Sequence, residues 1–248
     1  WSDAQLAKQR KDAQEVLAQL LDEQFKLEEL RVKDWADEAY AAALAQAGGG
    51  DELYRQQLYL DAAAAYQLAL DAMQLLSSEV ATVFATQLQI GLEALNSDQA
   101  EAALTALELA VHLHPDDGQA QQALARARNL PPLLDLLRQA NAARDANDLA
   151  GARQLLQLAN QLDPAHSGAK VLLADIEREI ARRDFNAAMS AGYQALDEQR
   201  FDDAERQFLK AQKILPTATE TDGALQQARG ARTVAKIEAY ERSAKGAE

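Results

Sequence analysis

Three segments of the chain repeat one pattern of small and bulky residues, and this repetition limits the possible folds more than any other feature. Each copy ends at a proline: Pro115, Pro164 or Pro216. Gly or Ala stands 24, 21, 12 and 5 residues before each proline, and a large apolar residue stands 8 before it. Each proline ends a helical stretch, and small residues let neighbouring helices approach closely, so the repetition predicts a series of similar helical units. In order of position, the residues are Gly91, Ala140 and Gly192; Ala94, Ala143 and Ala195; Ala103, Ala152 and Ala204; Leu107, Leu156 and Phe208; Ala110, Ala159 and Ala211.

The composition favours helices along the whole chain. Ala, Leu, Gln, Glu, Lys and Arg dominate the 248 residues, and all of them are good helix formers. Residues that strands favour are sparse, with aromatic residues at only 5%. No stretch alternates apolar and polar residues for long, as a half-buried strand does. We therefore predict an all-α protein.

The repeated unit resembles the tetratricopeptide repeat (TPR), a helix–turn–helix motif of about 34 residues. The resemblance rests on the small residues, the bulky residue and the final proline; it implies that two antiparallel helices cross at the small residues, with the bulky residue on the second helix packed beside the crossing. It implies an α-solenoid, a right-handed superhelix of stacked helix pairs. It also implies that a partner segment binds along the first helices of the pairs.

A fourth, weaker copy precedes the other three. Gly50, Leu53, Ala62, Tyr66 and Ala69 fit the pattern, but Gln74 stands where the proline should be. The prolines of the strong copies lie 49 and 52 residues apart, so the units need longer helices than the family has. We predict a long N-terminal helical segment over residues 1–47, a repeat array over 48–216 and a C-terminal capping helix over 217–248.

The N-terminal segment carries apolar residues at helical spacing. The stripe indicates one or two long helices that pack along the first repeat or cap the array; a short coiled coil or stalk is the alternative. Because the chain starts at Trp1 and has no Cys, we expect a periplasmic or cell-envelope protein with a membrane anchor upstream; a cytoplasmic location is the alternative. The stripe consists of Leu6, Ala13, Val16, Leu17, Leu20, Leu21, Leu27 and Leu30.

Turn-forming residues set the expected helix boundaries. Asn96-Ser97-Asp98, Asn147-Asp148 and Asp202-Asp203 are predicted to cap the second helices of the three strong copies. Pro131-Pro132 is predicted to begin a helix, and Gly48–Gly50 to form a kink or loop. Residues 220–243 are predicted to form the last helix. That helix either caps the array or starts a further unit, with the natural chain continuing past residue 248.

The sequence offers no candidate active site. Its net charge of −14 disfavours nucleic acid as a partner, and the lack of Cys excludes disulfides and thiolate zinc sites. His112 and His114 are two residues apart near a helix end and point to different faces, while His166 follows a proline in a turn. No run of 18 apolar residues is uninterrupted, so we expect no membrane-spanning helix within the chain. We predict no catalytic, cofactor-binding or metal-binding residue.

The resemblance does imply a protein-binding groove. By the proline alignment, the inner-surface positions of the first helices are mostly apolar rather than the Lys and Asn that clamp a terminal carboxylate in some family members. Such a groove suits a helix or extended segment anchored by apolar side chains. Packing of these residues against neighbouring helices is the alternative. The groove residues are Leu88, Leu92, Asn141, Arg144, Met189 and Tyr193.

These observations favour a non-catalytic scaffold that binds protein or peptide partners, forming the soluble part of a bacterial envelope-associated TPR protein. Two alternatives remain open. The chain is either a self-assembling structural module, or the docking arm of a larger enzyme or of a secretion or transport machine.

Overall fold

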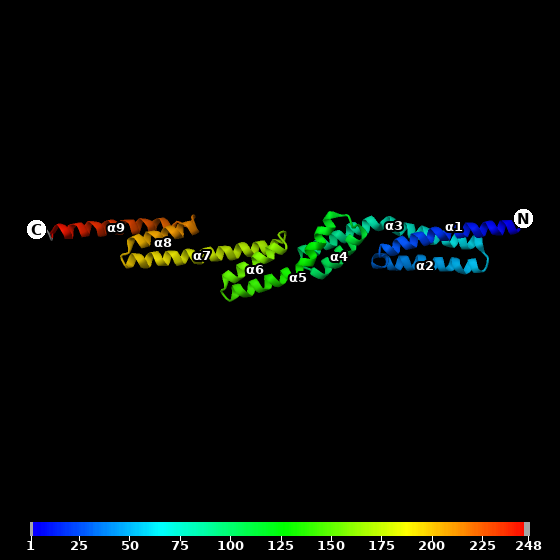
Figure 1. Cartoon of the computed structure of the whole chain (residues 1–248), viewed down its shortest axis with the longest axis horizontal. Coiled ribbons are helices and arrows are strands. Elements are labelled where there is room, and N and C mark those ends of the chain that lie inside the picture. Colours follow the sequence, from blue (N-terminus) through cyan, green and yellow to red (C-terminus); the bar gives the residue numbers. More distant parts are fainter. Residues whose placement is uncertain (1, 246–248) are drawn as a thin grey trace. The chain divides into compact units, whose positions relative to one another are not determined.

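The computed structural model describes residues 2–245, which form nine α-helices and no strand. The all-α prediction is therefore confirmed for this part of the chain. In chain order, the helices are α1 (Ser2–Glu29), α2 (Lys33–Arg55), α3 (Tyr59–Asn96), α4 (Ala100–Leu113), α5 (Gly118–Asp145), α6 (Leu149–Leu162), α7 (Ser167–Asp197), α8 (Phe201–Ile214) and α9 (Glu220–Lys245) (Figure 1).

The chain divides into two compact units, Trp1–Pro131 and Pro132–Glu248. The boundary falls inside the segment 48–216, which the sequence predicts as one repeat array. In the first unit, α1 and α2 both pack against α3. In the second unit, α8 packs against α7 and α9, and α6 packs against α7 (Figure 1).

Three residues of the N-terminal stripe, Ala13, Leu20 and Leu27, are buried in the first unit, whereas Leu6 and Leu21 are exposed. Leu20 and Leu27 belong to one apolar cluster with Tyr66 and Met73 of α3. Through these residues α1 packs along α3. Tyr40 of α2 completes the cluster, and its hydroxyl donates to Glu28 at 2.7 Å.

Close contact at small residues joins the helices of each repeated pair. A Cβ atom added to Gly91 would lie 2.3 Å from Cγ of Leu107, and one added to Gly192 would lie 2.4 Å from Cε1 of Phe208. At Gly50 the same atom would lie 2.6 Å from the ring of Tyr66. These distances are below van der Waals contact, so only glycine fits at these three crossings.

The contact recurs in one sequence register. The interval from the small residue at the crossing to the bulky residue is the same in all four copies, and an alanine stands at fixed positions before and after the bulky residue. These alanines and bulky residues are all fully buried or nearly so. The groups are Gly50 with Ala62, Tyr66 and Ala69; Gly91 with Ala103, Leu107 and Ala110; Ala140 with Ala152, Leu156 and Ala159; Gly192 with Ala204, Phe208 and Ala211.

The turn inside each of these four pairs contains one residue in the left-handed backbone region. It lies seven residues after the small residue at the crossing, and its φ is between 58° and 61°. A fifth such residue, Arg31 with φ 55°, stands between α1 and α2. The four in the pairs are Gln57, Asp98, Asn147 and Gln199.

In the proline-containing turns between pairs, a side chain caps the next helix. Asp117 and His166 each stand two residues after the proline and accept a hydrogen bond from a backbone N–H three residues on. The distances are 2.7 Å to the nitrogen of Ala120 and 3.0 Å to that of Ala169. Both acceptors therefore cap the helix that starts the next pair.

Two predicted helix breaks are wrong. Pro131-Pro132 lies inside α5 rather than at the start of a helix. Two backbone donors are missing there, and Leu130 and Leu133 on either side are buried. Gly48–Gly50 is helical and lies inside α2, because Gly50 is needed at the crossing with Tyr66.

The capping prediction holds for one of its three sites. Asp148 caps α6 by accepting from the nitrogen of Gly151 at 2.9 Å. Asn96-Ser97-Asp98 does not cap α4, because the residue before that helix is Gln99 and Asp98 has left-handed backbone angles. Asp202 and Asp203 lie within the first turn of α8, where they form ion pairs with arginines.

Ion pairs join α9 to α8. Arg229 Nε lies 2.6 Å from Oε1 of Glu205, and Arg232 Nη1 lies 2.9 Å from its Oε2. The Glu205 side chain is largely shielded from solvent, and its pKa is lowered mainly by the hydrogen bond from Arg229. The carboxylate therefore holds α9 against α8 only while it is ionised.

We expect Glu205→Gln to lower the stability of the second unit at neutral pH. Because the folded-state pKa lies below the ordinary value of about 4.3, the ion pairs stabilise the fold above that value. Their contribution is lost as the pH falls through the lowered pKa. Urea unfolding of both chains at pH 7 and pH 3 should show a difference that shrinks in acid. A difference of equal size at both pH values would contradict this assignment.

Candidate protein-binding surfaces

The six predicted groove residues divide between the two units. Leu88 and Leu92 lie on α3 in the first unit, and both are half-buried. Leu88 stands three residues before Gly91 and Leu92 one residue after it, so both flank the crossing with α4. Their exposed edges leave an apolar surface beside that crossing.

Asn141 and Arg144 lie near the C-terminal end of α5 in the second unit. Asn141 is exposed, and its side-chain amide donates to the carbonyl of Leu137 at 3.0 Å. Arg144 is half-buried and forms a two-pronged ion pair with Glu179 of α7. The hydrogen bond with Glu179 raises the pKa of Arg144, which further favours the charged form of the guanidinium.

Met189 and Tyr193 lie one helical turn apart on α7, but only one of them is accessible. Met189 is buried in the apolar cluster that contains Phe208 of α8, so it packs against neighbours rather than facing a partner. Tyr193 is 42% exposed, and its ring meets the ring of Phe208 edge-on with centroids 5.0 Å apart. The buried ring of Phe208 therefore supports the partly exposed ring of Tyr193.

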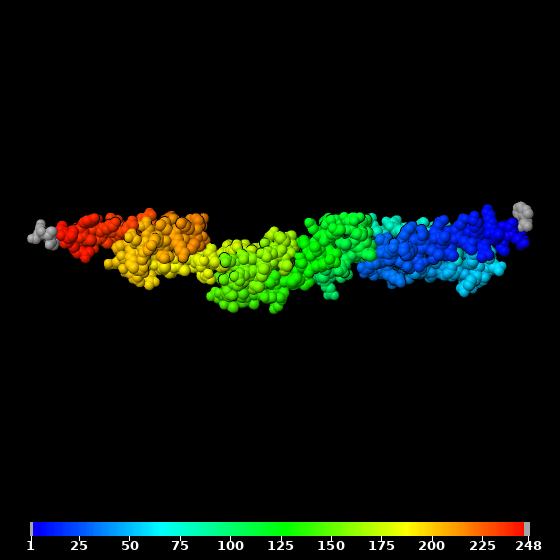
Figure 2. All heavy atoms as spheres, in the orientation of Figure 1, coloured from blue at the N-terminus to red at the C-terminus, as the bar shows by residue number. Residues whose placement is uncertain are grey.

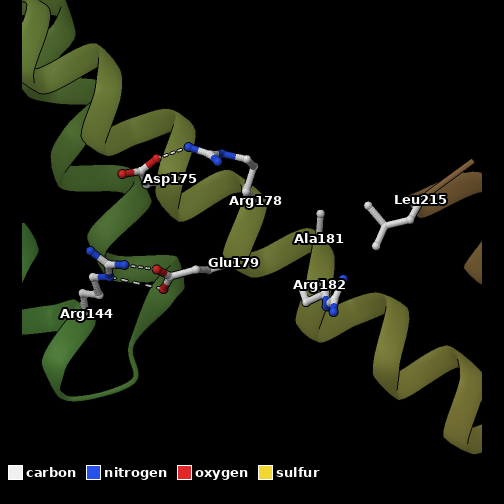
Figure 3. Close-up of a pocket in the computed structure, with 7 residues that line it drawn as sticks. All are labelled: Arg144, Asp175, Arg178, Glu179, Ala181, Arg182 and Leu215. Carbon is white, nitrogen blue, oxygen red and sulfur yellow. Dashed lines mark hydrogen bonds and ion pairs between the residues drawn. The ribbon is translucent and has the colours of Figure 1, made fainter. Parts of the chain in front are cut away.

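A hollow of about 650 Å³ lies next to Arg144 in the second unit. Figure 3 shows Arg144 facing Glu179, and Arg178 facing Asp175 on the same helix, α7. The full lining is Arg144, Asp175, Arg178, Glu179, Ala181, Arg182 and Leu215.

Arg182 gives this hollow a positive charge that is not neutralised. Its side chain is exposed, and it has no hydrogen bond or ion pair within residues 2–245, whereas Arg144 and Arg178 each face a carboxylate (Figure 3). Ala181 and Leu215 add apolar surface beside it. A guanidinium next to apolar side chains suits an acidic group of a partner that also carries an apolar residue.

Sequence reasoning found Arg144 but missed Arg182 and Leu215. Arg182 and Ala181 are close in sequence to other charged residues of α7, a pattern that an ordinary solvated helix face also has. Leu215 follows α8, so only the packing of α8 on α7 brings it to the hollow. The available signal was the cluster Arg178, Arg182 and Arg183 in a chain that is otherwise strongly acidic.

The first unit carries an exposed apolar stripe on α3. Leu60, Leu68 and Leu75 are each 60% exposed or more. Among the described residues, α3 is also the one helix whose length and composition would allow it to cross a membrane, with a mean hydropathy of 1.3 in its most apolar window. The expectation of no such segment relied on uninterrupted apolar runs and overlooked this helix, in which scattered polar residues break the runs.

Each of the three histidines has a structural partner. His112 Nε2 lies 2.7 Å from the carbonyl oxygen of Glu29, and the ring of His114 packs on that of Phe84. His166 caps α7 as described above. Within the described part of the chain, no group of three or more His, Asp or Glu side chains is placed to hold a metal ion.

Comparison with known proteins identifies no relative of the chain. No protein-family model, no curated protein and no solved structure matches the chain. The candidate surfaces are therefore interpreted from their own geometry and chemistry.

Proposed function

We propose that the chain is a non-catalytic scaffold of TPR-like helix pairs that binds protein or peptide segments. The observation that carries the proposal is the contact at Gly50, Gly91 and Gly192, which recurs with the bulky partner at the same interval each time. A chain that builds the same helix pair several times produces a series of similar exposed helix faces. Arrays of this kind characteristically serve as extended binding surfaces.

The binding surface of the second unit is the hollow beside Arg144 and Arg182 together with the exposed part of Tyr193. Its chemistry selects a partner segment that carries an acidic residue and apolar neighbours. Leu88 and Leu92 supply a separate apolar contact on the first unit. We further propose an envelope location, where a chain without cysteine forms no unwanted disulfide.

Crosslinking in cells tests the scaffold function. We expect Arg182→Glu and Tyr193→Ala each to reduce recovery of the specific partner about tenfold, the effect of losing about 1.4 kcal/mol of binding energy. Arg153→Glu is the matched control, because Arg153 is exposed on α6 of the same unit and also has no ion pair within residues 2–245. Equal recovery from all three folded variants would contradict this surface.

A further inference from the structure

The first half of α3 has a second apolar side besides the one in the core. Leu60, Leu68 and Leu75 are 67%, 60% and 63% exposed, and Ala64 between them is exposed as well. We call these four residues the α3 stripe. Figure 1 shows α1 lying along the first half of α3, and the atoms of α1 (blue) cover much of that half in Figure 2.

The α3 stripe lies opposite the side of α3 that packs in the core. Tyr66 and Met73 belong to the buried apolar cluster of the first unit. Leu68 and Leu75 follow Tyr66 by two and nine residues. Each interval places the leucine about half a turn around the helix from Tyr66, since a helix has about 3.6 residues per turn. The stripe is therefore directed away from the cluster that holds α3 in its unit.

In the other helix pairs, the same side of the second helix is open to solvent. Leu60, Ala64 and Leu68 have nine counterparts in the register of α4, α6 and α8, and of these only Leu109 is buried. Six of the nine are polar, as a solvated side requires. Stacking of helix pairs therefore does not explain why this side of α3 is apolar. The nine are Glu101, Thr105 and Leu109; Ala150, Gln154 and Leu158; Asp202, Arg206 and Lys210.

Charge disfavours a lipid surface as the occupant of the stripe. The sequence of α3 contains no Lys or Arg, and Asp61 and Asp71 border the stripe. Helices that lie on membranes are rich in Lys and Arg on their polar face, where these cations meet anionic headgroups. The net charge of −14 adds repulsion from such headgroups. A protein surface therefore suits the stripe better than a bilayer does.

The α3 stripe is complementary to itself. Leu60 stands eight residues before Leu68, and Leu75 stands seven after it, so both lie about two helical turns away. A two-fold axis beside Leu68 therefore places Leu60 of one copy next to Leu75 of the other in an antiparallel helix pair. The leucines of both copies then pack against one another along the whole stripe, so a second copy of the chain is a suitable occupant.

The acidic residues beside the stripe favour the same antiparallel arrangement. In that register, Asp61 of one copy faces Gln74 of the other. Asp71 faces Ala64, and the two Asp71 residues are about 10 Å apart along the helix axis, which is about the screening length of salt at physiological strength. A parallel pair would instead place each aspartate beside its own counterpart, where like charges repel.

We propose that two copies of the chain form a two-fold dimer in which their α3 stripes pack antiparallel, with Leu68 at the axis. The inference goes beyond the proposed scaffold function and does not rest on it. Such a dimer carries every binding surface of the scaffold twice, so a partner with two matching segments can bind both copies at once.

Sedimentation equilibrium of the full chain tests the dimer. We expect a monomer–dimer equilibrium in the micromolar range, because an interface of one helix per copy is small. Leu68→Asp should weaken the dimer at least tenfold, since two carboxylates would then meet at the axis. Leu158→Asp is the matched control: Leu158 is 49% exposed and occupies the position of Leu68 in the register of α6. The control should leave the equilibrium unchanged.

Thiol crosslinking tests the orientation of the two helices, because the chain has no cysteine of its own. An equal mixture of Leu60→Cys and Leu75→Cys chains, treated with a short bismaleimide, should give a crosslinked dimer. Leu60→Cys alone should give none, since its two copies lie about 20 Å apart along the axis of an antiparallel pair.

Four results would overturn the proposal. One is a monomer at millimolar concentration, and another is a dimer that Leu68→Asp leaves unchanged. The third is crosslinking of Leu60→Cys with itself, which would show a parallel pair. The fourth is flotation of the chain with phosphatidylcholine vesicles that Leu68→Asp abolishes, which would make a lipid surface the occupant. None of these bears on the Arg182 and Tyr193 crosslinking in cells, so a failure of the dimer is distinguishable from a failure of the scaffold function.

Discussion

Replacing Gly192 with leucine is expected to destabilise the second unit by about 3 kcal/mol, the upper part of the range for overpacked cores. The first added carbon would already lie 2.4 Å from the ring of Phe208. That ring is fully buried, so it has no free space into which to move. Urea unfolding followed by circular dichroism measures the loss, and amide hydrogen exchange in α7 and α8 locates it.

Gly48→Leu is the matched control for this substitution. Gly48 is also helical, but a Cβ atom there would meet nothing within 4 Å. Since glycine is a poor helix former, this change should raise the free energy of unfolding by up to about 1 kcal/mol. If both substitutions had the same effect, the close crossing at Gly192 would be refuted.

Truncating Phe208 to alanine is expected to cost about 3–5 kcal/mol, the usual range for a buried phenylalanine. The ring fills the space at the crossing and contacts Gly192 and Tyr193, so its loss leaves a cavity between α7 and α8. The neighbouring Leu209 is 37% exposed, and Leu209→Ala should change stability much less. Equal losses in the two variants would show that Phe208 does not hold the pair together.

The two large effects should not add. In the double variant the leucine at position 192 can enter the space that the phenyl ring has left. The combined loss is therefore expected to be smaller than the two single losses together, by at least about 1 kcal/mol. Strict additivity in a double-mutant cycle would mean that the two side chains are not in contact.

The helix pairs could be predicted from the sequence because their information is local. Gly91 and Leu107 are separated by the same short interval as Gly192 and Phe208, and each pair of positions repeats with the same residue classes. Packing of a small residue against a bulky one needs no knowledge of the rest of the fold. The pattern therefore identified the helices that touch and the residues through which they touch.

Features that depend on competition between local preference and packing could not be predicted. Gly48–Gly50 has a strong preference for a turn, but burial of Gly50 against Tyr66 keeps it helical. Asp98 has the side chain of a helix cap, but the turn places it in the left-handed region. At Gly50 the contact with Tyr66 outweighs a local preference of about 1 kcal/mol, and at Asp98 the geometry of the turn outweighs a capping preference of similar size.

The candidate surfaces were predictable only in part, for a similar reason. Spacing along α7 placed Met189 and Tyr193 on one side of the helix, yet it could not say that Met189 is covered while Tyr193 is accessible. The hollow beside Arg182 depends on Leu215, which reaches it through the packing of another helix. To predict a surface formed by several helices, one must know how the helices are arranged. The spacing of residues within one helix does not give that arrangement.

The left-handed turn residues suggest how the protein could be made more robust. Arg31, Gln57 and Gln199 adopt φ between 55° and 61°, a conformation that costs residues with ordinary side chains about 1–2 kcal/mol each. Asn147 occupies the same position in its own turn, and asparagine tolerates this conformation well. The third pair thus already contains the residue that an engineer would introduce into the others to obtain a more heat-resistant variant.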